Sequence, residues 1–180
     1  IDIAVLEVGI GGRLDATNTV KPLVSIITNV SLEHTQILGD SIEKIAYEKA
    51  GIIKENGVVV TAAEGKALEK ITEIARERNA KFIVNGLAMK SRNRTTDNWI
   101  EKFDADVFDK EYAGLELGLF GEHQIKNALC ALGAVSILQQ DGIEITENAI
   151  RTGLKEVKWP GRMEIVQQKP MVILDCAKDV

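Results

Sequence analysis

The sequence has little cysteine and no long hydrophobic run. Among its 180 residues the only cysteines are Cys130 and Cys176, and their spacing matches no metal-binding pattern. Two isolated thiols argue against a disulfide framework and favour a reducing compartment. No apolar run approaches the roughly 20 residues that a membrane-spanning helix needs, and the first residues lack the pattern of a signal peptide. We therefore expect a soluble, cytoplasmic protein without a membrane partner.

An excess of positive charge is also missing. The chain has 22 Lys and Arg residues against 27 Asp and Glu residues, which gives a formal net charge of −5. Its densest basic patch, formed by Lys90, Arg92 and Arg94, is followed at once by acidic residues and is typical of a solvated loop. Nucleic-acid surfaces need clustered positive charge, so we expect no nucleic-acid partner.

Strand-like runs alternate with helical patterns over the first half of the chain. Apolar runs typical of strands, the first two of them buried on both faces, occupy residues 1–8, 24–30, 58–60 and 82–84. Helices are expected at residues 41–53, with Asp40 or Ser41 as N-cap, and at 64–79. This alternation predicts an α/β fold whose sheet is mostly parallel, with right-handed crossovers.

The pattern changes in the second half. Short polar and apolar pieces between residues 87 and 119 predict a small antiparallel addition, and helices follow at 122–140 and 146–157. The breaker Trp159-Pro160-Gly161 predicts a hinge. We expect one domain over residues 1–158, a hinge at 159–162 and the start of a second α/β domain at 163–180. Because both ends lie inside strand-like runs, we expect a fragment of a longer protein.

Two polar residues follow the first two predicted strands. Glu7 closes the first apolar run, and His34 comes just after the second. The carboxyl ends of parallel strands share one edge of a sheet, where open α/β folds bind ligands. A carboxylate and an imidazole there could hold Mg²⁺ together with water and a phosphate. A lone histidine is nevertheless more often an ordinary surface or core group.

A glycine-rich segment follows Glu7 directly. The run from Gly9 to Arg13 departs from the dinucleotide-binding pattern, because Leu14 stands where the third glycine is needed. A structural turn is therefore favoured over a phosphate-binding loop. The short polar side chains at 15–18 could still grip a polar ligand.

Lys49 falls on the apolar stripe of the helix predicted at 41–53. It lies seven residues after Ile42 and four before Ile53, so all three share one face. A lysine in this place can lay its stem on the core and extend its amine to water. Alternatively, a partly buried neutral amine can react with carbon dioxide and form a metal-binding carbamate. The residue pattern alone favours the first interpretation.

Two later groups are suited to a nucleotide. His123 and Asn127 lie four residues apart on one face of the helix predicted at 122–140. Arg162 places a planar, bidentate donor at the predicted hinge, where it suits a phosphate or a ribose. Each feature alone is more often cap or surface chemistry.

Taken together, five segments resemble the folylpolyglutamate synthase/dihydrofolate synthase family, a branch of the Mur ligase superfamily. They occur in the family's order and spacing over nearly the whole chain, and they span residues 7–18, 33–39, 45–52, 121–128 and 159–164. The resemblance implies an ATP-dependent carbon–nitrogen ligase. In such an enzyme ATP phosphorylates a pteroate or folate carboxylate, and the amine of glutamate attacks the acyl phosphate.

The resemblance also implies roles for individual residues. Glu7 and His34 would be Mg²⁺ ligands, and Lys49 would carry a carbamate that helps to place a second Mg²⁺, which makes Lys49 and His34 the catalytic candidates. The remaining assignments concern substrate and nucleotide. The pterin would contact Leu14, Asp15 and Ala16, and ATP would contact Asn127, Arg162 and Asp175.

Two departures from the family pattern leave alternatives open. No G-x-x-x-x-G-K-[ST] phosphate loop occurs in the sequence, and Lys178 and Asp179 stand where the family has histidine and asparagine. The protein could instead be another Mur-type amide ligase, including one that acts on a methanopterin-type pterin or a cell-wall peptide. It could also be a non-catalytic binding module that keeps the fold. The segment from Leu14 to Asn18 favours the folate branch.

Overall fold

A computed structural model describes residues 2–176, so the expected departures at Lys178 and Asp179 lie outside the described residues. The chain divides after Val84 into two compact units, and each is described by itself. The domain boundary expected at residues 159–162 stays a prediction.

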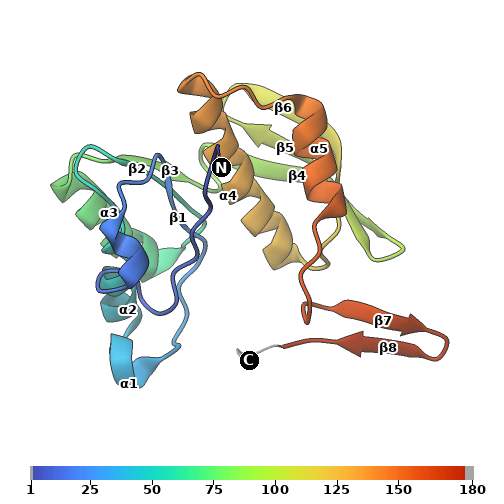
Figure 1. Ribbon diagram of the computed structural model, residues 1–180, viewed down its shortest axis with the longest axis horizontal. Helices are drawn as coiled ribbons and strands as arrows, with labels where there is room; N and C mark the ends of the chain where they lie inside the picture. Colours follow the sequence, from blue (N-terminus) through green and yellow to red (C-terminus); the bar gives the residue numbers. More distant parts are fainter. Residues whose placement is uncertain (1, 177–180) are drawn as a thin grey trace. The chain divides into compact units, whose positions relative to one another are not determined.

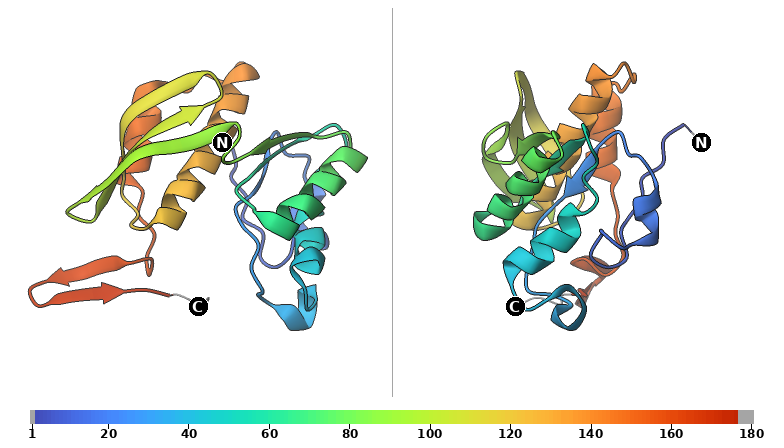
Figure 2. Two further views of the ribbon diagram at one scale, coloured as in Figure 1. Left: turned by 180° about the vertical axis from the view of Figure 1, so that it is seen from behind. Right: turned by 90° about the vertical axis from the view of Figure 1, so that its left-hand side faces the viewer.

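The first unit is an α/β layer (Figures 1 and 2). Its elements are η1 (Ala16–Thr19), β1 (Ser25–Ile27), α1 (Thr35–Leu38), α2 (Ile42–Ala50), β2 (Val58–Thr61), α3 (Gly65–Glu77) and β3 (Lys81–Val84). The strands pair in parallel in the order β1-β2-β3, with Ile26 opposite Val60 and Val60 opposite Ile83. The predicted parallel arrangement is confirmed.

Small and branched side chains fill the space between this sheet and its helices. Helices α2 and α3 pack on each other and, with β1 and β2, enclose a core whose buried members include Ala46, Ile53, Val59 and Ile71. Alanines at the contact allow the two helices to approach closely. Ser41 is the N-cap of α2, since its hydroxyl accepts a hydrogen bond from the Lys44 amide at 3.3 Å.

Two strand predictions need correction. Residues 2–8 form no strand, and most of their apolar side chains are exposed, with Val5 at 94% and Leu6 at 53%. A strand buried on both faces needs paired neighbours and cover on each side, and this segment has no ladder partner among the described residues. β1 is shorter than residues 24–30, and Ile26 is 40% exposed on this edge strand of the described sheet.

The second unit is built on an antiparallel sheet. Its elements are β4 (Met89–Asp97), β5 (Ile100–Val107), β6 (Lys110–Leu117), α4 (Glu122–Gln140), α5 (Glu147–Glu156), β7 (Glu164–Gln168) and β8 (Met171–Leu174). Strands β4, β5 and β6 pair in sequence order, and β7 pairs with β8 as a separate hairpin. The predicted antiparallel addition, both helices and both late strands are confirmed.

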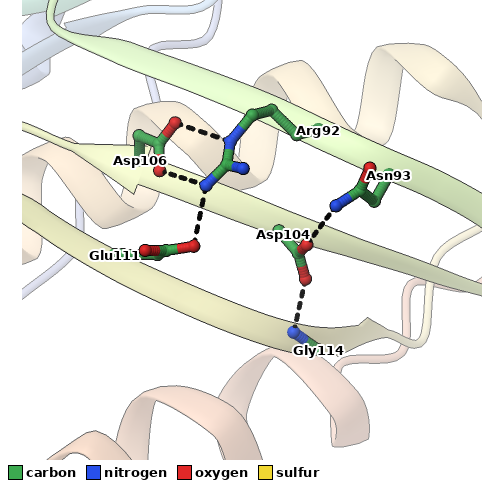
Figure 3. Close-up of polar contacts among 6 residues, drawn as sticks. All are labelled: Arg92, Asn93, Asp104, Asp106, Glu111 and Gly114. Atoms are coloured by element: carbon green, nitrogen blue, oxygen red, sulfur yellow. Dashed lines mark hydrogen bonds and ion pairs between the residues drawn. The ribbon is translucent and has the colours of Figure 1, made fainter.

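The two faces of the β4-β5-β6 sheet differ in chemistry. Alternate residues of β5, from Glu101 to Val107, are buried where α4 packs on β4 and β5. The other face carries ion pairs, in which Arg92 contacts Asp106 and Glu111, each at 2.8 Å, and Asp104 accepts from Asn93 and from the Gly114 amide (Figure 3). Exposed pairs of this kind add little stability individually. Among residues 2–176, no helix is both long and apolar enough to cross a membrane.

Candidate active site

Glu7 and His34 lie in the first unit outside its regular strands. Glu7 is exposed in the irregular segment 2–8. His34 is the N-cap residue of α1 and has φ 48° and ψ 36°, a left-handed conformation that is uncommon for residues other than glycine. Its carbonyl accepts hydrogen bonds from the amides of Ile37 and Leu38, both at 2.9 Å. The residue as a whole is exposed. That the two side chains share one magnesium ion stays a prediction.

Lys49 pairs with the residue next to His34. Its Nζ atom lies 2.7 Å from Oε1 of Glu33, and the side chains of Lys49 and Glu33 are only 22% and 31% exposed. The amine is therefore held at the loop that follows β1 and does not extend into open solvent. The sequence did not single out Glu33, because no local pattern pairs it with Lys49 further along the chain.

Asp15 organises the glycine-rich segment. Its carboxylate accepts hydrogen bonds from the amide and hydroxyl of Thr17, at 2.9 and 2.6 Å, and from the Gly9 amide at 3.1 Å. The Thr17 hydroxyl, followed by the backbone amides, holds the pKa of this carboxyl below its ordinary value. Leu14, at 80% exposure, and the exposed Ala16 flank it.

The same segment is fixed to the end of α2. Arg13 makes a bidentate pair with Glu48, and its amide donates to the Glu48 carbonyl at 2.8 Å. A Cβ atom on Gly51 would come 2.3 Å from Cβ of Arg13, and one on Gly12 would come 2.8 Å from Cγ2 of Ile52. The glycines here permit close packing, which agrees with the structural turn that the sequence favoured.

His123 and Asn127 occupy the first two turns of α4 in the second unit, and both are exposed. The Asn127 amide donates to the side-chain oxygen of Gln124 at 3.1 Å. The His123 ring lies over Gly121, since a Cβ atom there would come 2.7 Å from Cε1 of His123. These side chains are thus presented at one end of the helix.

Arg162 and Asp175 come together at the base of the β7–β8 hairpin. Arg162 Nη1 donates to the Cys176 carbonyl at 3.2 Å, the Met163 amide donates to Oδ1 of Asp175 at 3.3 Å, and the Cys176 amide donates to the Gly161 carbonyl at 2.7 Å. The base of the hairpin is therefore closed by one backbone–backbone bond, between Cys176 and Gly161, and by side-chain bonds of Arg162 and Asp175 to the opposite backbone.

Within residues 2–176, no group of three or more His, Cys, Asp or Glu side chains is arranged to hold a metal ion. Magnesium commonly takes only one or two protein carboxylates together with water and substrate phosphates.

Comparison with known families bears on this arrangement. The profile of the Mur ligase middle domain matches residues 1–135. The chain belongs to the Mur ligase family. Over 179 residues it is 40% identical to a dihydrofolate synthase/folylpolyglutamate synthase of Bacillus subtilis, and the match covers 98% of this chain and 42% of that protein.

Solved structures of this family share the fold. A folylpolyglutamate synthase of Mycobacterium tuberculosis, complexed with ADP and AMPPCP, superposes with a TM-score of 0.90 at 33% identity, covering 98% of this chain and 41% of that one. A complex described as FPGS–AMPPCP–folate gives a TM-score of 0.91 at 32% identity, covering 97% of this chain and 43% of that one. The chain thus spans about two fifths of the length of each of these three proteins.

Proposed function

We propose that the complete protein is an ATP-dependent ligase that joins glutamate to a folate- or pteroate-type carboxylate through an acyl phosphate. The 40% identity to the B. subtilis dihydrofolate synthase/folylpolyglutamate synthase, which extends over 98% of this chain, carries the proposal. Similar structures described as complexes with AMPPCP, an ATP analogue, and with folate support the choice of nucleotide and acceptor.

The residues of the first unit would handle the metal and the acceptor. Glu7 offers the hard oxygen donor that Mg²⁺ prefers, and His34 offers an exposed imidazole beside the Glu33 carboxylate. Mg²⁺, when bound, would offset the charge on the transferred phosphoryl group. Leu14 and Ala16 would contact the pterin, while Asp15 would hold their loop in shape.

The residues of the second unit would hold ATP. Asn127 presents a carboxamide from α4, and the Arg162 and Asp175 side chains bond to backbone groups at the base of the β7–β8 hairpin. A guanidinium binds phosphate or ribose oxygens through two parallel hydrogen bonds. In this proposal these three side chains orient the nucleotide, and the acceptor carboxylate attacks its terminal phosphate.

We further propose that Lys49 carries a carbamate in the complete enzyme. Its amine is held 2.7 Å from Glu33 and is only partly exposed. The neutral amine would add to carbon dioxide and release a proton, and the resulting carbamate would supply an oxygen donor next to the loop that carries His34.

We propose that the enzyme works in the cytoplasm and binds neither a nucleic acid nor a membrane. Both described cysteines are free thiols, and burial raises the pKa of the Cys130 thiol to about 12, which leaves it protonated and unreactive.

The test is ligase activity of the complete protein. ADP release should require MgATP, a reduced pteroate or folate acceptor and glutamate together, and mass spectrometry should find the acceptor extended by one glutamyl unit. Activity with a methanopterin-type or peptide acceptor, and none with folates, would assign the chain to another Mur-type ligase. Absence of ADP release with every acceptor would support a non-catalytic binding module.

A further inference from the structure

Glu101 is a fully buried carboxylate that the proposed reaction does not use. Its side chain is 0% exposed, and it stands on β5 in the register otherwise filled by Phe103, Ala105 and Val107. A buried charge is costly unless it is paired and hydrogen-bonded. Its position in an apolar register therefore calls for an explanation.

The carboxylate has donors on both of its oxygens. Arg94 donates from Nη2 to Oε1 at 2.9 Å and from Nε to Oε2 at 3.1 Å, and the Thr96 hydroxyl donates to Oε2 at 3.0 Å. The fourth donor is the backbone amide of Gly121, at 3.0 Å from Oε1. Three of these bonds stay inside the β4–β5 hairpin, and the fourth leaves it.

The fourth bond reaches the N-cap of α4. Gly121 precedes the first helical residue and has φ 117°, a backbone conformation that residues other than glycine rarely adopt. Arg94 also extends to Glu122 in the first turn, with Nη1 3.4 Å from Oε2. The tip of the hairpin adds a ring contact, since Trp99 and Phe120 meet edge to face at 5.0 Å between centroids. The hairpin thus holds the start of α4 at three points.

Gly121 in turn supports His123. The imidazole ring lies directly over the glycine, because even a Cβ atom there would come 2.9 Å from Nδ1 of His123. Asn127 lies one turn further along the same helix face. Any rotation of the Gly121 peptide would therefore shift the ring and the helix start from which both side chains extend.

We propose that Glu101 is a positioning residue for the nucleotide: by fixing the Gly121 amide it sets the place of His123 and Asn127 and thereby the affinity for ATP. The inference rests on the proposed function, in which Asn127 contacts ATP. Glu101 itself touches no substrate. A residue that only stabilised the fold would affect all substrates alike, whereas loss of Glu101 should selectively weaken the binding of ATP.

The experiment replaces Glu101 by glutamine in the complete protein. Glu101→Gln keeps the volume and removes the charge, so the carboxamide can no longer accept from Arg94 and Gly121 as strongly. We expect KM for ATP to rise by roughly tenfold, while KM for glutamate and for the acceptor changes by less than about twofold. Hydrogen exchange of the Gly121 and Glu122 amides should accelerate, while the amides of the middle of α4 keep their protection.

A matched control lies on the same strand. Asp106→Asn also turns a paired carboxylate into a carboxamide, but Asp106 pairs with Arg92 on the other face of the sheet, away from α4 (Figure 3). It should leave KM for ATP unchanged. An equal rise in KM for ATP in both variants would overturn the inference, as would a Glu101→Gln protein that is less stable but binds ATP normally.

Two further variants and a binding measurement apply if Glu101→Gln does not fold or if the native protein has no ligase activity. Thr96→Val removes one donor and leaves the Gly121 bond, so it should lower stability without changing nucleotide affinity. Glu101→Asp shortens the side chain and draws the carboxylate away from Gly121, so it should lower the affinity for the nucleotide. Calorimetric binding of AMPPCP reads this difference without turnover. A wild-type protein that binds AMPPCP but performs no ligation would refute the proposed function alone.

Discussion

Most acidic side chains around the candidate site of the first unit are already bound to neighbours. Asp15 holds Thr17 and Gly9, Glu48 holds Arg13, and Glu33 holds Lys49. Glu7 is instead exposed, in a segment without regular structure. At the scale of single residues, the carboxylates that build the loop can thus be separated from the one proposed for the metal.

Lys49 gives the sharpest residue-level prediction. In the complete protein, Lys49→Ala should reduce ligase turnover by orders of magnitude, because the proposed carbamate would be lost, and added formate or acetate should restore part of it by supplying a carboxylate. Steady-state ADP release measures both effects. Lys44→Ala is the control, since Lys44 lies on the same helix, is largely exposed and pairs with Asp40. Full activity of Lys49→Ala would refute the carbamate.

Asp15 gives a pH-dependent prediction. Its hydrogen bonds with Thr17 lower the pKa of the carboxyl in the folded state, so the folded protein binds this proton less readily than the unfolded chain does. The resulting stabilisation is present above the unfolded pKa of about 3.9 and disappears as the pH falls through the folded pKa. The Tm difference between wild type and Asp15→Asn should therefore be positive at neutral pH and vanish in acid. A Tm difference between wild type and Asp15→Asn that stays the same at all pH values would show that the carboxylate does not hold the loop.

At the scale of elements, the sequence pattern predicted the helices, whose bounds depend on neighbouring residues and their caps. The helix expected at 122–140 is α4 with the same bounds, and the helix that begins after Ser41 is capped by that hydroxyl. The strand expected at 1–8 is absent from the described residues, because an apolar run becomes a strand only when neighbouring strands pair with it. Sequence alone does not supply those partners.

The site could be predicted only as a set of separate residues. The pairs Arg13–Glu48 and Glu33–Lys49 join positions that are far apart in the chain, and no single helix or strand pattern reveals them. Glu101 left a weaker trace, a charged residue in the register of Phe103 and Ala105. Such a break in two-residue periodicity marks a buried charge that needs partners.

The contact between the glycine-rich segment and α2 can be tested through Gly51. Its φ of −57° suits any residue, so only space limits a substitution, and a Cβ atom would come 2.5 Å from Cα of Arg13. Gly51→Ala should destabilise the protein by about 1–3 kcal/mol, as overpacking does. Chemical denaturation followed by circular dichroism measures the change.

Gly153 provides the contrasting control within α5. No atom lies within 4 Å of an added Cβ there, so Gly153→Ala should stabilise the protein by about 0.5–1 kcal/mol through the lower entropy of the unfolded helix segment. Equal effects of the two substitutions would show that the close approach of Arg13 to Gly51 does not matter for stability.

At the scale of the whole molecule, the 180-residue chain contains the residues proposed for catalysis but lacks a phosphate-loop motif. Carboxylate, imidazole and lysine candidates lie in the first unit, and the nucleotide candidates lie in the second. The G-x-x-x-x-G-K-[ST] pattern, whose backbone amides and lysine cradle nucleotide phosphates, occurs nowhere in the sequence.

This omission predicts the behaviour of the isolated chain. Without those phosphate contacts, the 180 residues alone should release no ADP above background in the presence of MgATP, a pteroate or folate acceptor and glutamate. Transfer of the phosphoryl group depends on positioning and charge neutralisation, and most of both comes from groups that bind the phosphates directly. The complete native protein, assayed at the same concentration, is the positive control. Turnover by the isolated chain that depends on both acceptor and glutamate would show that residues present here can cradle the phosphates, and Arg162→Ala and Asn127→Ala would then identify whether the proposed nucleotide groups do so.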